Sequence, residues 1–139
     1  MNWIIYAVAC VILYGIMQFF IKLASTGSNP FVASMIFISV QFVAQIILGS
    51  YFISKSDLDI SSDNIKYGIV GGIAAAIATI LFFMALKQAP LSKVVPVVNM
   101  NVVVGVFLGM IFLKDVMNTR IAAGIVLAVM SIYLLTNSS

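Results

Sequence analysis

Residues 67–86 read YGIVGGIAAAIATILFFMAL, an uncharged run bounded by Lys66 and Lys87. A helix needs about 20 apolar residues to cross the hydrocarbon core of a bilayer. Further uncharged runs lie on either side, at 2–21, 23–54, 94–113 and 121–139. They lack the period-two alternation of polar and apolar residues that a membrane β-barrel requires. The sequence therefore predicts an all-α membrane protein of five transmembrane helices, over about 2–23, 31–54, 65–87, 92–113 and 118–136.

The composition agrees with a protein that crosses the membrane several times. Of 139 residues, 63% are hydrophobic and 8% are charged, whereas a soluble domain carries about 25% charged residues. The seven Lys and Arg residues are scattered rather than gathered on a basic face, which excludes a nucleic-acid binder. With one cysteine and no histidine, the chain lacks the usual residues of a metal centre or a general base. We therefore expect no enzyme activity, no metal and no cofactor.

The connections between the helices are short, and the longest runs from Ser54 to Asn64. The polar stretch Ser25–Pro30 is expected to form the turn between the first two helices. Because the first helix lacks a basic n-region, we expect it to be retained rather than cleaved as a signal peptide. So little of the chain lies outside the bilayer that its function must reside between the helices. We expect a single domain over 1–139, located in the plasma membrane.

Small residues mark places where helices can pack closely in a bilayer. Gly68 and Gly72 form a GxxxG step in the third helix, and Gly105 and Gly109 repeat it in the fourth. Packing within one subunit explains such steps, and so does a dimer seam. The third helix has so many small residues that we expect it to be enclosed on several sides. We therefore place the seam on the fourth and fifth helices.

Uncharged polar residues follow the helical repeat through the spans, and no ionisable side chain lies deep in any span. In the first helix, polar residues recur every four positions from Tyr6 to Lys22 and share one face. Such residues either join helices through hydrogen bonds or line a polar cavity for a neutral or zwitterionic solute. We adopt the second interpretation, and the candidate substrate-binding residues are Tyr14, Gln18, Gln41, Gln45, Thr79, Asn99 and Asn101.

Two prolines lie at the start of the fourth helix. Pro90 falls in the turn before it, where a missing amide donor costs little. Pro96 lies about one turn further in, where a proline frees a carbonyl and loosens the start of the helix. Transporters use broken helices to expose backbone groups to a substrate. A helix-starting proline without a functional role is the alternative interpretation.

Three stretches occur in a characteristic order: Tyr14-Gly15 with Phe19 and Lys22, then Ala85–Pro96, then Phe112–Asp115 followed by Gly124 nine residues beyond Asp115. Together they resemble the EamA-type domain of the drug/metabolite transporter superfamily. The first stretch resembles that family's first-helix signature, the second its link between the third and fourth helices, and the third its corner between the fourth and fifth. The resemblance covers the whole chain and is stronger over 65–136 than over 1–55.

The resemblance implies one five-helix repeat. Most relatives carry two such repeats with inverted topology around a central cavity, and they export or exchange small metabolites. The four-helix small multidrug resistance proteins are shorter cousins that work as dimers. This sequence lacks their first-helix glutamate, which argues against drug/proton antiport. It also has Phe37 where many EamA domains have an arginine, which argues against an anionic substrate.

We therefore expect a transporter of a small polar, zwitterionic or amphipathic metabolite that works by alternating access. The alternatives are a lipid-carrier flippase component, with Lys22 or Lys93 meeting a phosphate, and a non-transporting scaffold or partner subunit. The expected partners are the lipid bilayer, a small-molecule substrate and a second chain. The loops on one side of the membrane carry four Lys or Arg residues, and those on the other side carry three. This difference is too small to favour one orientation of the chain. This balance predicts an antiparallel homodimer, with a parallel dimer or a heterodimer with a paralogue as alternatives.

Overall fold

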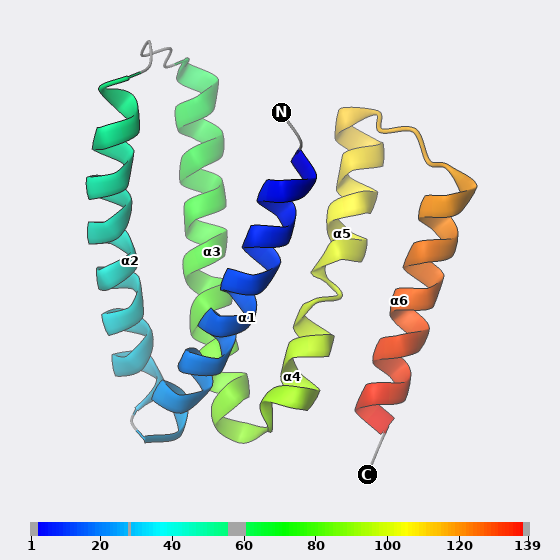
Figure 1. The fold of residues 1–139 in the computed structure, drawn as a ribbon, viewed down its shortest axis with the longest axis horizontal. Helices are drawn as coiled ribbons and strands as arrows, with labels where there is room; N and C mark the ends of the chain where they lie inside the picture. Colours follow the sequence, from blue (N-terminus) through cyan, green and yellow to red (C-terminus); the bar gives the residue numbers. More distant parts are fainter. Residues whose placement is uncertain (1–2, 28, 56–60, 138–139) are drawn as a thin grey trace. The chain divides into compact units, whose positions relative to one another are not determined.

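The computed structural model describes residues 3–27, 29–55 and 61–137, and every regular element within them is helical (Figure 1). A shorter apolar helix, Thr119–Asn137, ends the described chain. Four helical stretches in these residues are long and apolar enough to cross a membrane, namely Trp3–Gly27, Pro30–Ile53, Ser62–Gln88 and Leu91–Leu113. The prediction of an all-α membrane protein built on five helical stretches is confirmed for the described residues.

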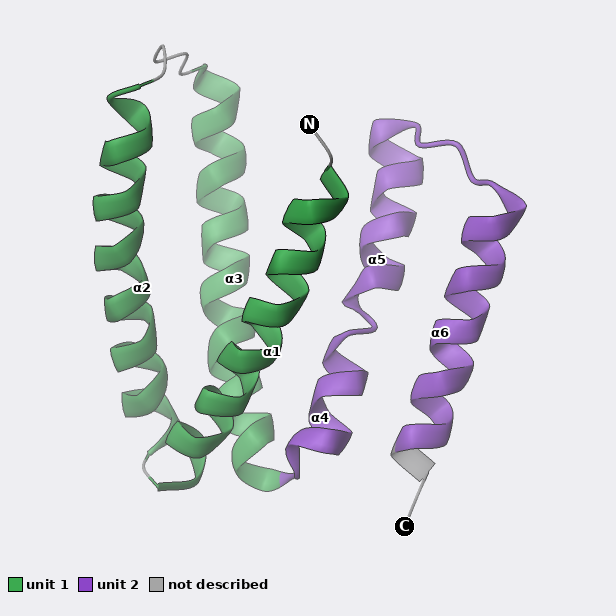
Figure 2. Cartoon of the chain, in the orientation of Figure 1, with its two compact units in different colours: residues 1–88 green, residues 89–139 purple. Residues whose placement is uncertain are grey.

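The chain forms two compact units, residues 1–88 and residues 89–139 (Figure 2). The helices of the first unit are α1 (Trp3–Gly27), α2 (Pro30–Ile53) and α3 (Ser62–Gln88). Those of the second unit are α4 (Leu91–Val98), α5 (Asn101–Leu108), the π-helix η1 (Gly109–Leu113) and α6 (Thr119–Asn137). The expected fourth span, 92–113, thus consists of three helical segments rather than one continuous helix.

The first helix continues through residues that we expected to form a turn. The Ser25 hydroxyl donates to the Ile21 carbonyl at 2.7 Å, and the Thr26 hydroxyl lies 2.9 Å from the Leu23 carbonyl and 3.1 Å from the Lys22 carbonyl. Hydroxyls that bond back to the carbonyls of their own helix lose their tendency to start a turn. The prediction of a turn from Ser25 is therefore wrong, and α1 ends at Gly27.

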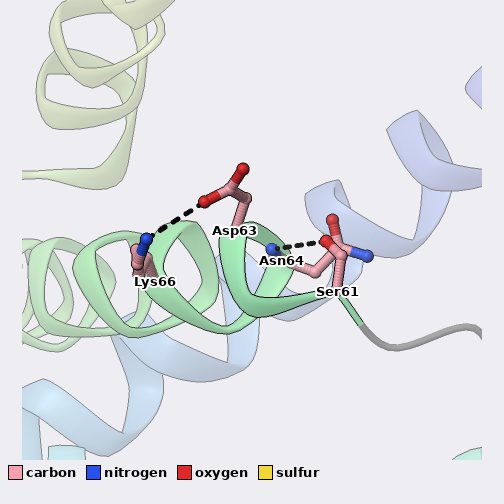
Figure 3. A network of polar contacts seen from close by, with 4 residues as sticks. All are labelled: Ser61, Asp63, Asn64 and Lys66. Atoms are coloured by element: carbon pink, nitrogen blue, oxygen red, sulfur yellow. Dashed lines mark hydrogen bonds and ion pairs between the residues drawn. The ribbon is translucent and has the colours of Figure 1, made fainter.

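Side-chain caps define the starts of the next two helices. The Asn29 side chain accepts a hydrogen bond from the Phe31 amide at 3.0 Å, with Pro30 at the first helical position of α2. At the start of α3, the Ser61 hydroxyl accepts a hydrogen bond from the Asn64 amide at 3.2 Å, and Lys66 pairs with Asp63 at 3.1 Å (Figure 3). An acidic residue in the first turn also suits the positive end of the helix dipole. The predicted loop Ser54–Asn64 lies partly outside the described residues.

The core of the first unit lies at one end of its three helices. Phe83 and Leu86, near the carboxyl end of α3, have no exposed surface. They belong to the same end as the last turns of α1 and the first turns of α2, whose buried residues are Ile21, Ser25, Pro30, Ala33 and Ser34. The Phe37 and Phe83 rings join α2 to α3, with centroids 5.8 Å apart. The helices are therefore held together most tightly at this end.

α3 packs against both α1 and α2, but the glycines in its amino-terminal half, where we expected close packing, are open. Gly68, Gly71 and Gly72 are exposed, and a Cβ added to any of them would meet no atom within 4 Å outside its own helix. The reason is that the fully buried residues of α3 lie only near its carboxyl end. Within the described chain, the glycines of the α3 GxxxG step are therefore not in close contact with another helix.

In the second unit, the fourth span is interrupted after Val98. The Met100, Val102 and Val103 amides bond to carbonyls three residues earlier, at 3.1, 3.3 and 2.9 Å. Pro96 lies inside α4 without ending it, so the predicted loosening at the helix start occurs instead one turn later, at Asn99 and Met100. The span ends at Lys114, whose φ of 58° is left-handed, and the Asp115 amide bonds back to the Gly109 carbonyl at 3.2 Å.

Candidate functional site

An open groove of about 300 Å³ lies between α2 and α3. We call it the amide groove because two glutamine side chains, Gln41 and Gln45, line it from α2. Thr79 faces them from α3. The remaining lining residues are apolar or small: Ile38 and Phe42 on α2, with Gly72, Ala75 and Ala76 on α3.

The groove follows from the helical repeat on both of its walls. Its residues on α2 are spaced at i, i+3, i+4 and i+7 from Ile38, and those on α3 have the same spacing from Gly72. This spacing defines a single helix face. The face on α3 carries glycine and alanine, whose short side chains leave room for the longer residues of α2. The groove therefore forms because the large side chains on α2 do not fill the space beside the small side chains on α3.

The groove lies halfway along both helices. Gln41 is the twelfth of the 24 residues of α2, and Ala75 is the fourteenth of the 27 residues of α3. Phe37 comes one turn before Gln41, and Phe83 comes one turn after Thr79. The contact between their rings therefore lies about one turn beyond these groove residues, on the side of the buried core. Phe37, where the family resemblance led us to expect an arginine, contacts Phe83 and does not line the groove.

The polar groups of the groove are two carboxamides and one hydroxyl. The Thr79 hydroxyl donates to the Ala75 carbonyl at 2.8 Å, and its oxygen keeps lone pairs that can accept. Gln41 and Gln45 are exposed, and neither side-chain amide has a hydrogen-bond partner within the described chain. Each carboxamide offers two donor hydrogens and one acceptor oxygen. The groove can therefore hold a molecule through several neutral hydrogen bonds.

The structure brings three of the seven predicted substrate-binding residues, Gln41, Gln45 and Thr79, into the amide groove. Tyr14 and Gln18 lie on α1 and do not line it. Asn99 and Asn101 are exposed at the interruption between α4 and α5, in the second unit. The roles of all seven residues in binding stay predictions.

Sequence reasoning missed the apolar residues of the groove. Ile38 and Phe42 were not among the candidate residues, and Ala75 and Ala76 belong to the small residues for which we expected close helix packing. The signal that could have found them is the matching repeat on the two helices, because Ile38 and Phe42 flank Gln41 on one helix face. The repeat identifies each face, but only the packing shows that the two faces are opposite each other.

Lys22 has a contact of its own at the core end of the first unit. It is half-buried, and its ammonium donates to the Leu86 carbonyl at 2.5 Å. Leu86 is among the last four residues of α3, whose carbonyls have no partner within the helix. A cation at this position also suits the negative end of the helix dipole. Lys22 therefore joins α1 to the carboxyl end of α3.

Comparison with known proteins agrees with this architecture. The model of the EamA-like transporter family matches residues 1–137. An uncharacterized protein of Methanocaldococcus jannaschii is 27% identical over 136 residues, which cover 98% of this chain and 97% of that protein. No solved structure gives a significant match. The chain, a helical membrane protein with candidate transmembrane spans, belongs to the EamA-like transporter family, whose members are transporters rather than enzymes.

Proposed function

We propose that the chain is one subunit of a plasma-membrane transporter that moves a small polar or amphipathic solute by alternating access. The observation that supports this is the amide groove, which lies halfway along two membrane-spanning helices. Its Gln41 and Gln45 side chains, both on α2, have no hydrogen-bond partner among the described residues. Transporters bind their substrates near the bilayer midplane, at a site that opens to each side in turn. The tightly packed end at Phe83 and Leu86 would serve as the pivot for that motion.

The transporter is proposed to be an antiparallel homodimer. Five helices put the two ends of the chain on opposite sides of the membrane, and the loops carry four Lys or Arg residues on one side and three on the other. So small an excess gives little preference for one orientation. Two copies in opposite orientations would form the inverted pair of repeats on which alternating access depends.

Transport is tested by measuring flux in proteoliposomes. Solutes are first selected by thermal shift of the purified protein in detergent, because a ligand that binds the folded state raises its apparent stability. We expect Gln45→Leu to lower the flux of a selected solute about tenfold, since it removes a hydrogen bond worth about 1 kcal/mol or more. We expect Gly72→Leu to lower flux at least as much, because the new side chain fills the groove.

Gly68→Leu is the matched control for Gly72→Leu. It lies one turn away on the same helix and outside the groove, and an added Cβ meets nothing within 4 Å at either position. Both variants should therefore fold, and only Gly72→Leu should block transport. Unchanged flux in both Gln45→Leu and Gly72→Leu would show that the amide groove is not the transport site.

Orientation is tested with single cysteines in a Cys10→Ala background. Ser61 and Gln88 flank α3 at its two ends, so cysteines there report opposite sides of the membrane. An antiparallel dimer requires each position to be labelled partly from outside the cell and partly only after permeabilisation. One-sided labelling at both positions would rule out the antiparallel homodimer.

A further inference from the structure

The amide groove carries no charge. Its eight lining residues are apolar, small, amide or hydroxyl side chains. The nearest charged residue on its two helices is Lys66, six positions before Gly72, which is about 9 Å along the helix axis. That lysine is already paired with Asp63. Lys87 and Lys55 lie further away, at eight positions from Thr79 and ten from Gln45.

A charged ligand would enter this groove without a countercharge. Transfer of an unpaired ion from water to an apolar environment carries a large desolvation penalty, whereas a neutral amide or hydroxyl recovers most of its cost through hydrogen bonds. The groove supplies such hydrogen bonds through Gln41 and Gln45, which are one helical turn apart. Residues at that spacing have Cβ atoms about 5–6 Å apart. A ligand of matching length could bond to both amides at once.

The apolar surfaces of the groove suit a flat molecule. On α2 the wall includes the ring of Phe42, and on α3 it consists of Gly72, Ala75 and Ala76. A volume of about 300 Å³ is at the lower limit of small-molecule sites. We propose that the amide groove selects uncharged, flat amphipathic molecules with two hydrogen-bonding groups about one helical turn apart. This inference rests on the proposed transport function and names the substrate class of the same site.

The test uses three molecules of nearly the same shape. Nicotinamide is neutral, nicotinate is an anion and 1-methylnicotinamide is a permanent cation. Their dissociation constants are measured on the purified wild-type protein by equilibrium dialysis in detergent. We expect nicotinamide to bind at least about tenfold more tightly than either ion, because only the ions lose hydration without gaining a countercharge. Equal or tighter binding of either ion, or no binding of nicotinamide, would overturn the proposal.

A charge introduced at the groove gives a second, independent readout. Gln45→Glu keeps the shape of the side chain and supplies a carboxylate, so the affinity for 1-methylnicotinamide should rise at least about tenfold. Asn64→Asp is the matched control, because it makes the same amide-to-acid change at the exposed start of α3, outside the groove. Should Gln45→Glu fail to fold, Gln41→Glu makes the same test. An unchanged affinity for the cation in a folded groove variant would contradict the assignment.

The outcome also separates this inference from the proposed function. Selective binding of nicotinamide without flux in proteoliposomes would support the substrate class and refute transport. Flux of a charged solute that is lost in Gln45→Leu and Gly72→Leu would support transport and refute the substrate class.

Discussion

Replacement of Lys22 by methionine tests the contact between α1 and the carboxyl end of α3. Methionine keeps an unbranched apolar stem but removes the ammonium that donates to the Leu86 carbonyl. Hydrogen bonds to charged groups contribute about 1.5–3 kcal/mol in soluble proteins, whereas hydrogen bonds between transmembrane helices average about 0.6 and reach about 1.7 kcal/mol. A cation at a helix carboxyl end adds about 0.3–1 kcal/mol. Together these values predict that Lys22→Met lowers the free energy of unfolding by about 1–2 kcal/mol.

The measurement is reversible unfolding of the purified protein in mixed micelles with increasing denaturing detergent. Lys87→Met is the matched control, because Lys87 is an exposed lysine in the last turn of α3, next to Leu86 in the sequence. Its replacement should cost less than about 0.5 kcal/mol, as expected for a surface substitution. Equal effects of the two substitutions would refute the role of Lys22 as a bond between helices. A loss of solute binding in Lys22→Met with unchanged stability would instead place Lys22 in the transport site.

Three further substitutions test the packing and the turns. Phe83→Ala removes a fully buried ring, so the free energy of unfolding in the same assay should fall by about 2–4 kcal/mol. A loss below about 1 kcal/mol would show that the core end is not tightly packed. Lys114→Gly relieves the strain of a non-glycine residue with a left-handed φ of 58°. It should raise the free energy of unfolding by up to about 1 kcal/mol, and a decrease would contradict the cap geometry. Gly109→Ala places a Cβ 2.6 Å from the Asp115 carboxylate. It should destabilise the wild type by about 1 kcal/mol and the Asp115→Ala background by less, and equal costs in both backgrounds would exclude the contact.

The spans were predictable because charge is costly in hydrocarbon. Lys66 and Lys87 bound an uncharged run, and α3 extends from Ser62 to Gln88, only a few residues beyond each of them. A different signal, the polar stretch that starts at Ser25, was misleading, because the Ser25 and Thr26 hydroxyls bond to carbonyls of their own helix and do not end it. The position of the interruption after Val98 was also not predictable, because a proline weakens a helix without determining which turn loses its α-helical hydrogen bonds.

The candidate site was predictable only in part. The spacing of Gln41 and Gln45 showed that they share a helix face, and the position of Thr79 showed that it lies deep in its span. That the two faces are opposite each other depends on the register between α2 and α3, which the contact between the Phe37 and Phe83 rings helps to determine. This register depends on packing and cannot be read from the periodicity of either helix. The bond from Lys22 to Leu86 joins residues 64 positions apart and was equally invisible.

The scarcity of charge connects the proposed orientation with the proposed substrate. A membrane potential of 100 mV changes the free energy of moving one elementary charge across the membrane by about 2.3 kcal/mol. If an ion moved through the groove, this free energy would favour opposite directions of movement relative to the two oppositely oriented copies. An uncharged solute in an uncharged groove is free of that bias, and both copies can then serve one transport cycle equally. The few charged residues lie toward the ends of the helices and in the connections between them, and their Lys and Arg residues are nearly balanced between the two sides in the proposed topology. A groove without charge and connections without a clear excess of positive charge are therefore two features that the proposed antiparallel dimer would require.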